Sequence, residues 1–259
     1  MLNDKPGAMV EIFLAEIFFF VMAWYLQAIN RMSYGWYSKI IMIILGFIGI
    51  LIHRKRSRNY TLLPRNIAFS IKWSIYTLVL FTVVDLITLL IFSSTVSRIK
   101  IDLKMLVIDL VWFFIFVGFA EELFFRGYSQ PRLNEVFTEK YKKILGIEYE
   151  WSKGTLIVAV LFFGIPHILT GVNPFTGRAN INPLIVMVTL FACFLGVLFG
   201  VLREKSGGIV LPTILHGLID FTVYGIGRII GIIFSNFAAG ISIFLFLAIF
   251  FEKILKEEI

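Results

Sequence analysis

Residues 183–202 read PLIVMVTLFACFLGVLFGVL, twenty consecutive residues without a charged side chain. At about 1.5 Å of rise per residue, a helix of roughly 20 residues crosses the ~30 Å hydrocarbon core of a bilayer. A surface helix of a soluble protein of this length would keep one polar face. This stretch therefore predicts a transmembrane helix.

The same pattern recurs along the whole chain. Of the 259 residues, 59% are apolar and only 16% are charged, whereas soluble domains keep about a quarter of their residues charged. Eight apolar runs are candidate spans: 9–29, 36–52, 70–92, 104–122, 155–170, 183–202, 209–224 and 226–251. We therefore expect an all-α fold, a polytopic membrane helical bundle of about eight transmembrane helices.

Basic residues are distributed unevenly between the two sides that these spans define. Seventeen Lys and Arg residues fall on the side that carries both termini, and seven fall on the other side. Because cytoplasmic loops carry the excess of basic residues, we expect both termini in the cytoplasm. This bias accounts for the net charge of +7, and no nucleic-acid partner is expected.

The longest polar stretch, residues 127–154, mixes Lys, Glu, Tyr, Phe and Trp. This composition is typical of an amphipathic helix that lies at a membrane surface. We expect such a helix on the cytoplasmic side.

Two adjacent acids end the fourth apolar run. Glu122 and Arg126 are four residues apart, so on a helix they share a face with the acid N-terminal to the base, the better order for an ion pair. Glu121 lies about 100° around the helix and has no local cation. It is therefore the carboxylate that we expect to be available for proton abstraction. The alternative is a polar patch where the helix leaves the membrane.

Two histidines lie in other apolar runs. His167 directly follows Pro166, which removes a helix donor and bends the chain. His216 and Asp220 are four residues apart, so the carboxylate can orient the ring or both groups can face one ligand. The alternative for each site is a hydrogen-bonded structural role within the bundle. Asp85 and Asp109 have no motif around them, and we interpret them as interhelical hydrogen-bond partners.

These residues form three motifs in chain order: Glu121-Glu-x-x-x-Arg126, Phe163-x-x-x-His167 and His216-x-x-x-Asp220. The pattern resembles the signature of the CPBP (Abi) family, which comprises type II CAAX prenyl endopeptidases and bacteriocin-processing or self-immunity proteins. The resemblance covers roughly residues 105–224 and implies a CPBP-like catalytic core there. It leaves residues 1–104 as N-terminal transmembrane helices with a basic cytoplasmic loop, and 225–259 as a C-terminal transmembrane helix with a short cytoplasmic tail.

The resemblance implies a glutamate-dependent intramembrane protease that needs no metal or other cofactor. Glu121 would be the general base that activates water, and His167 would help to hold that water. His216 and Asp220 would polarise the scissile carbonyl and stabilise the oxyanion. The expected partners are a peptide or prenylated-protein substrate and membrane lipid, and substrate would arrive from the cytosolic side or laterally from lipid. Supporting residues would be Glu122, Arg126 and Phe163.

Asp220 departs from the prenyl endopeptidases, in which this position is characteristically Asn. An ionised carboxylate repels an oxyanion, so Asp220 would have to be protonated or act by orienting His216. This departure weakens the CAAX substrate assignment, and another membrane peptide is an equal candidate.

Three other functions remain open at this stage. A zinc-dependent protease could use Glu121, His167 and His216 as ligands. A non-enzymatic membrane scaffold or bacteriocin-immunity protein would use the polar cluster only to hold helices together. A proton-coupled transporter could relay protons through buried carboxylates, although the sequence has no clear inverted repeat.

Overall fold

A computed structural model of the chain describes residues 4–29, 35–54, 60–92 and 102–259. Within these residues, eight helical segments are long and apolar enough to cross a membrane. The predicted fold class is confirmed: the protein is an all-α, multi-pass membrane helical bundle. Several of the counted basic residues lie outside the described part of the chain, namely Arg31, Lys55, Arg56, Arg58, Arg98 and Lys100.

The first three spans are single helices: α1 (Lys5–Ile29), α2 (Trp36–His53) and α3 (Ile67–Phe92). The fourth is one continuous helical run, Leu103–Val136, made of α4 (Leu103–Val111), η1 (Trp112–Phe119), α5 (Ala120–Glu122), η2 (Leu123–Ser129) and α6 (Gln130–Val136). The fifth combines α7 (Lys153–Ile157), η3 (Val158–Gly164) and the 3₁₀ segment η4 (Ile165–Gly171).

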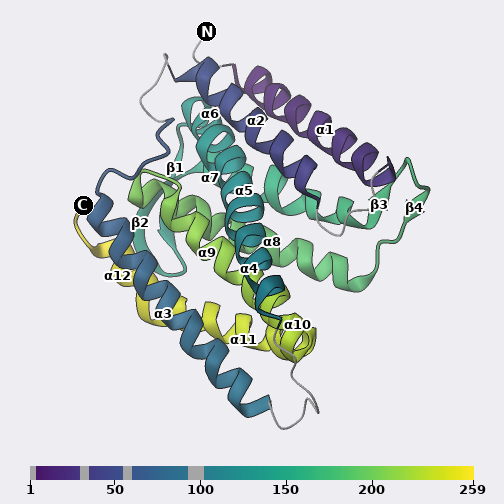
Figure 1. Cartoon of the computed structure of the whole chain (residues 1–259). Helices are drawn as coiled ribbons and strands as arrows, with labels where there is room; N and C mark the ends of the chain where they lie inside the picture. The colour runs from purple at the N-terminus through teal and green to yellow at the C-terminus, as the bar shows by residue number, and fades with distance from the viewer. Residues whose placement is uncertain (1–3, 30–34, 55–59, 93–101) are drawn as a thin grey trace.

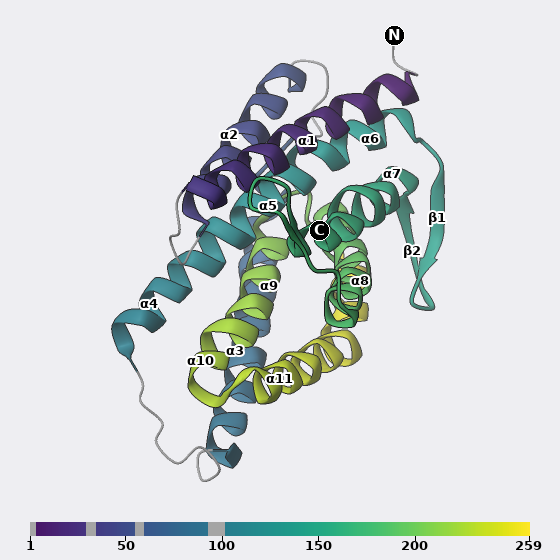
Figure 2. The same ribbon diagram turned by 90° about the vertical axis from the view of Figure 1, so that its right-hand side faces the viewer.

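The last three spans complete the bundle (Figures 1 and 2). They comprise α8 (Pro183–Ser206); α9 (Val210–Asp220), η5 (Phe221–Ile226) and α10 (Gly227–Ile230); and α11 (Ile232–Leu245), η6 (Phe246–Phe251) and α12 (Glu252–Lys256).

Local sequence explains where these spans begin and end. The Asp102 side chain accepts a hydrogen bond from the Met105 amide and caps α4, and Asn182 caps α8 in the same way. Gly207 ends α8 in the left-handed conformation, with φ of 75°. Gly231, with φ of 90°, separates the seventh span from the eighth, a few residues later than the break expected near residue 225.

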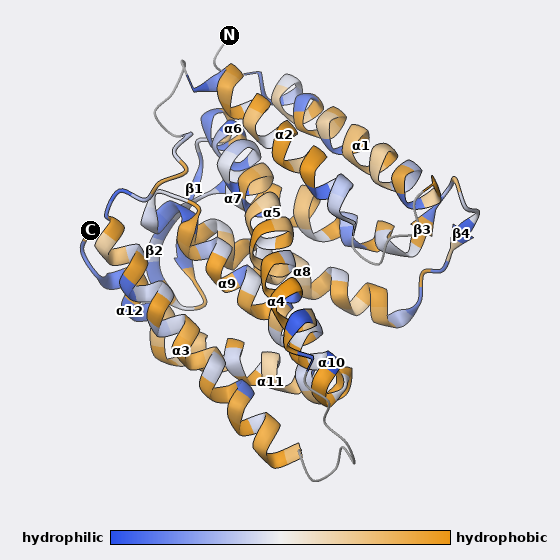
Figure 3. Cartoon of the chain, in the orientation of Figure 1, coloured by the Kyte–Doolittle hydropathy of each residue, from blue (hydrophilic) through white to orange (hydrophobic). Residues whose placement is uncertain are grey.

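The bundle has two distinct ends. At the terminal end, Lys5 at the start of α1 lies 3.3 Å from Glu139, and the carbonyl of Glu257, just after α12, accepts a hydrogen bond from Lys205. Figure 1 shows both termini and the hairpin β1–β2 (Lys140–Ile144 and Ile147–Ser152) on this side. The hairpin β3–β4 (Val172–Asn173 and Arg178–Ala179) lies at the other, distal end. Figure 3 shows hydrophobic residues along the spans, whereas β1, β2 and β4 are largely hydrophilic.

The prediction of a surface helix over 127–154 is wrong. The fourth span continues to Val136, with Gly127–Pro131 buried in the protein, and then β1 (Lys140–Ile144) pairs with β2 (Ile147–Ser152) as an antiparallel hairpin. Leu145 and Gly146 both take positive φ in the turn, which suits a tight hairpin. Tyr141 and Trp151 lie opposite each other across the strands, a pairing that stabilises a sheet rather than a helix.

The interpretation of the two isolated aspartates is supported by their contacts. Asp85 on α3 accepts a hydrogen bond of 3.0 Å from the Thr222 hydroxyl on η5. Asp109 on α4 forms an ion pair with Arg228 on α10, with 2.8 Å between Oδ2 and Nε. Both aspartates therefore join neighbouring spans.

Candidate active site

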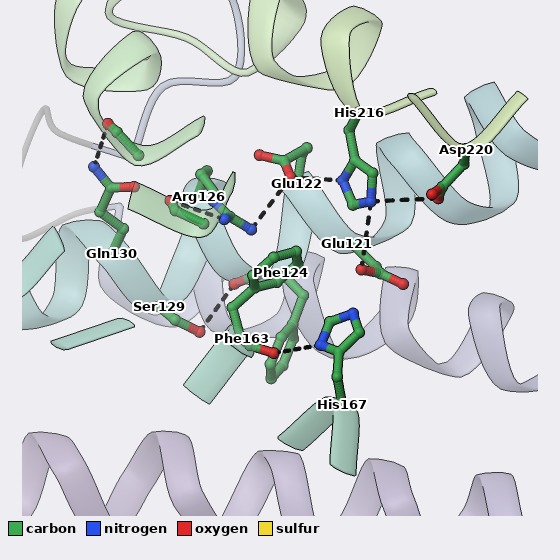
Figure 4. A network of polar contacts seen from close by, with 12 residues as sticks. Glu121, Glu122, Phe124, Arg126, Ser129, Gln130, Phe163, His167, His216 and Asp220 are labelled. Atoms are coloured by element: carbon green, nitrogen blue, oxygen red, sulfur yellow. Dashed lines mark hydrogen bonds and ion pairs between the residues drawn. The ribbon is translucent and has the colours of Figure 1, made fainter. Parts of the chain in front are cut away.

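The two adjacent glutamates lie in the middle of the fourth span and both are buried. Glu122 and Arg126 form the predicted ion pair, with 3.2 Å between Oε1 and Nη1, and neither side chain is more than 1% exposed. Figure 4 shows Glu121 on a different face of the same helix, directed toward His167 and His216. The helical periodicity therefore places the two acids on different faces, as expected. Glu122 pairs with Arg126 on its own helix, and Glu121 faces the neighbouring spans.

Arg126 is held by aromatic and backbone groups as well as by Glu122. Its guanidinium lies 4.1 Å from the centroid of the Phe163 ring, a cation–π contact. It also donates a hydrogen bond of 3.1 Å to the Gly196 carbonyl on α8. Arg126 therefore links the first motif to the fifth and sixth spans.

His216 on α9 is surrounded by three carboxylates. Its Nδ1 lies 2.9 Å from Glu122 Oε1, and its Nε2 lies 3.5 Å from Asp220 Oδ2 and 3.8 Å from Glu121 Oε2. The ring stacks on Phe199 with 4.9 Å between centroids. The predicted pairing of His216 with Asp220 is present, and His216 also bridges both glutamates.

His167 is positioned by its own helical turn. Its Nδ1 lies 2.7 Å from the Phe163 carbonyl in η3. Because a carbonyl oxygen can only accept, Nδ1 must donate, which leaves the Nε2 lone pair of a neutral ring free. Figure 4 shows this ring directed toward Glu121. His167 can therefore accept a hydrogen bond beside the Glu121 carboxylate.

Glu121 also has a cation that the sequence analysis did not anticipate. Lys39, near the start of α2, forms an ion pair with Glu121 Oε1. The expectation that Glu121 lacks a local partner holds along its own helix, but a distant span supplies one.

A cavity of about 290 Å³ lies beside part of this cluster, in the distal half of the bundle. Glu121, Lys39 and His167 line it, whereas His216 and Asp220 are not among its lining residues. Its remaining wall comes chiefly from aromatic side chains of α1 and the fifth span, and from the β3–β4 hairpin.

Two polar residues of α1 that the motifs did not identify also line this cavity, Glu16 and Gln27. Glu16 is only 5% exposed, and its Oε1 has no hydrogen-bond partner among the described residues. The signal that could have identified Glu16 and Lys39 is the general one that a charged residue inside a span is a functional candidate. Neither residue lies in a recognisable motif.

The three side chains considered as zinc ligands were Glu121, His167 and His216. The described residues contain no group of three His, Cys, Asp or Glu side chains placed to hold a metal ion. The imidazole of His167 is oriented by a backbone carbonyl, and that of His216 by carboxylates.

Fold and site together define a multi-pass membrane protein with buried carboxylate and imidazole groups beside an internal cavity. Residues 103–222 match the family model described as type II CAAX prenyl endopeptidase Rce1-like. This match agrees with the family resemblance of the three motifs, which lie within the matched segment, and it supports a CAAX-type intramembrane protease role in general. No curated protein and no solved structure matches the chain.

Proposed function

We propose that this protein is an intramembrane endopeptidase in which Glu121 activates the attacking water. The observation that carries the proposal is that Glu121 and His167 line the same cavity inside the bundle. A water between a carboxylate and a free imidazole nitrogen is held where a general base can take its proton. The Rce1-like match over 103–222 supports this function.

The proposed reaction needs no covalent intermediate. Glu121 takes one proton from the water while the water oxygen bonds to the scissile carbonyl carbon, and the carbonyl π electrons move onto its oxygen. When the carbonyl re-forms, the C–N bond breaks and the proton held by Glu121 passes to the leaving amine. The products are a carboxyl group and an amine, and Glu121 is again ionised.

His216 and Asp220 are assigned to the support of this base. The resemblance gives them contact with the scissile carbonyl, but neither side chain lines the cavity that Glu121 and His167 share. His216 instead bridges Glu122, Asp220 and Glu121. We therefore assign both as positioning residues, with Glu122, Arg126 and Phe163 bracing them.

The cavity favours a substrate that reaches the site within the membrane. Its volume is at the lower end of the range for ligand sites, and Phe19, Phe20 and Trp24 of α1 contribute to its apolar wall. Such a wall suits an apolar peptide segment or a lipid-modified C-terminus. Prenylated CAAX-type peptides and other membrane peptides are both candidates.

The position of the cavity bears on how substrate arrives. Its lining residues in α1, α2 and the fifth span lie toward the distal end, away from the termini. If the basic terminal end is cytoplasmic, as we propose from the charge bias, then substrate arrives laterally or from the opposite side. Of the two expected routes, this position favours lateral entry from lipid over entry from the cytosol. A green fluorescent protein fused after Ile259 should fluoresce in cells if the C-terminus is cytoplasmic.

The function is tested by incubating the purified full chain with prenylated CaaX peptides and with a membrane-proteome peptide set. Mass spectrometry should locate cuts made by the wild type and absent from Glu121→Gln. No cut by folded wild-type protein would favour the scaffold or immunity function. Loss of cleavage on chelation, reversed by zinc, would instead favour the metal-dependent alternative.

A further inference from the structure

Lys39 enters the site from α2, outside the segment 103–222 that the family model matches. Its ammonium group pairs with Glu121 Oε1, and its side chain is 15% exposed. It also lines the cavity together with Glu121 and His167. Lys39 is thus a cation directly beside the proposed base and facing the space that the substrate would occupy.

Carboxylates outnumber cationic side chains around His216. Glu121, Glu122 and Asp220 all lie within 3.8 Å of the His216 ring nitrogens. Arg126 is fully buried and pairs with Glu122. An ionised Asp220 has no hydrogen to donate to a developing oxyanion, and it does not line the cavity. Lys39 and Arg178 are the Lys and Arg side chains that line the cavity, and of these two Lys39 forms the ion pair with Glu121.

We propose that Lys39 stabilises the oxyanion of the reaction; this inference rests on the proposed function. In the resting site the ammonium group neutralises the Glu121 carboxylate. As Glu121 takes the water proton, its negative charge disappears and an equal charge forms on the carbonyl oxygen of the bound peptide. The ammonium group stays in place while its partner changes from carboxylate to oxyanion. A fixed cation beside the charge that develops in the transition state lowers the barrier.

The inference predicts that the positive charge at position 39 matters more than the exact shape of the side chain. Lysine is a compact point charge on a flexible stem, and arginine carries the same charge in a planar group. A Lys39→Arg variant should therefore keep much of the activity, whereas Lys39→Met should not.

The test measures kcat and KM of Lys39→Met and Lys39→Arg for a substrate found in the cleavage assay described above. Removing one oxyanion-stabilising group typically lowers kcat by about 10²–10³-fold, and we expect that loss in Lys39→Met with KM little changed. Lys72→Met is the matched control, because Lys72 pairs with Glu257 at the terminal end of the bundle, and it should keep the wild-type kcat.

Unchanged kcat in Lys39→Met, or a Lys39→Arg variant as impaired as Lys39→Met, would overturn the inference. If Lys39→Met does not fold, Lys39→Gln replaces it, since the amide can still hydrogen-bond to Glu121 without the charge. If cleavage requires Glu121 but Lys39→Met is fully active, the role of Lys39 is contradicted while the proposed function stands. A wild type that cleaves nothing would contradict the proposed function itself.

Discussion

His216 and Glu122 share a contact of 2.9 Å between Nδ1 and Oε1, and the same carboxylate oxygen lies 3.2 Å from Arg126 Nη1. This one oxygen atom therefore contacts both His216, from the third motif on α9, and Arg126, from the helix that carries Glu122. Because Glu122 is fully buried, this contact makes it the structural centre of the site, while Glu121 is left to face the cavity.

Loss of Glu122 should therefore reduce stability more than loss of a surface acid. Removing one partner of a buried ion pair costs about 3–5 kcal/mol, because the other charge is stranded. We expect Glu122→Ala to lower the free energy of unfolding in detergent by about that amount. Glu148 pairs with Lys143 at 3.7 Å on the exposed hairpin, so Glu148→Ala should cost less than about 1 kcal/mol. Equal unfolding temperatures for the two variants would contradict the role of Glu122.

His167 should be needed for turnover but not for folding. Its Nδ1 makes a hydrogen bond within one turn, and Nε2 is assigned to the water. His167→Ala should abolish peptide cleavage while the protein remains folded in detergent. His53 is the matched control, because its Nε2 lies 2.6 Å from Glu11, away from the cavity. Folded His53→Ala protein should still cleave, and equal loss in both variants would remove His167 from the mechanism.

Gly196 should be required for close packing of α8 against η3. A Cβ atom there would lie 2.9 Å from the Ala159 carbonyl oxygen and 2.9 Å from a ring carbon of Phe163. Gly196→Ala should therefore displace Phe163 and cost about 1–3 kcal/mol through overpacking. At Gly240 an added Cβ meets nothing within 4 Å, so Gly240→Ala should be neutral or slightly stabilising. Thermal unfolding of both variants decides this, and a neutral Gly196→Ala would contradict the packing argument.

Much of the fold could be predicted from composition, because lipid requires runs of about 20 apolar residues and satisfied backbone groups. Composition did not predict the helix over 123–136, because there the helix is buried in protein rather than in lipid. The hairpin could have been recognised from the alternation in Ile147–Ser152, where outward Glu residues separate the aromatic ones.

The candidate site was predictable only where its contacts are local. Glu122 with Arg126, and His216 with Asp220, follow from helix spacing. The pairing of Lys39 with Glu121 joins two spans that are far apart in the sequence, so no periodicity in the sequence predicts it. The cluster around His216 likewise depends on how α9 packs against the fourth span.

Asp85 should be dispensable for catalysis. Its Oδ2 accepts a hydrogen bond from Thr222, and an asparagine oxygen can accept the same bond. Asp85→Asn should therefore keep the wild-type cleavage rate, with a stability change of less than about 1 kcal/mol. A complete loss of function in this variant would instead support a proton relay through the buried carboxylates, as in a transporter.

The central claim is that the Glu121 carboxylate removes a proton from the attacking water. The most direct measurement is kcat/KM of Glu121→Gln for the identified substrate, compared with the wild type under the same conditions. Glutamine has nearly the same shape but cannot serve as the base, so we expect a loss of about 10²–10⁴-fold or more in a folded protein. A Glu121→Gln variant that cleaves at the wild-type rate would contradict the account.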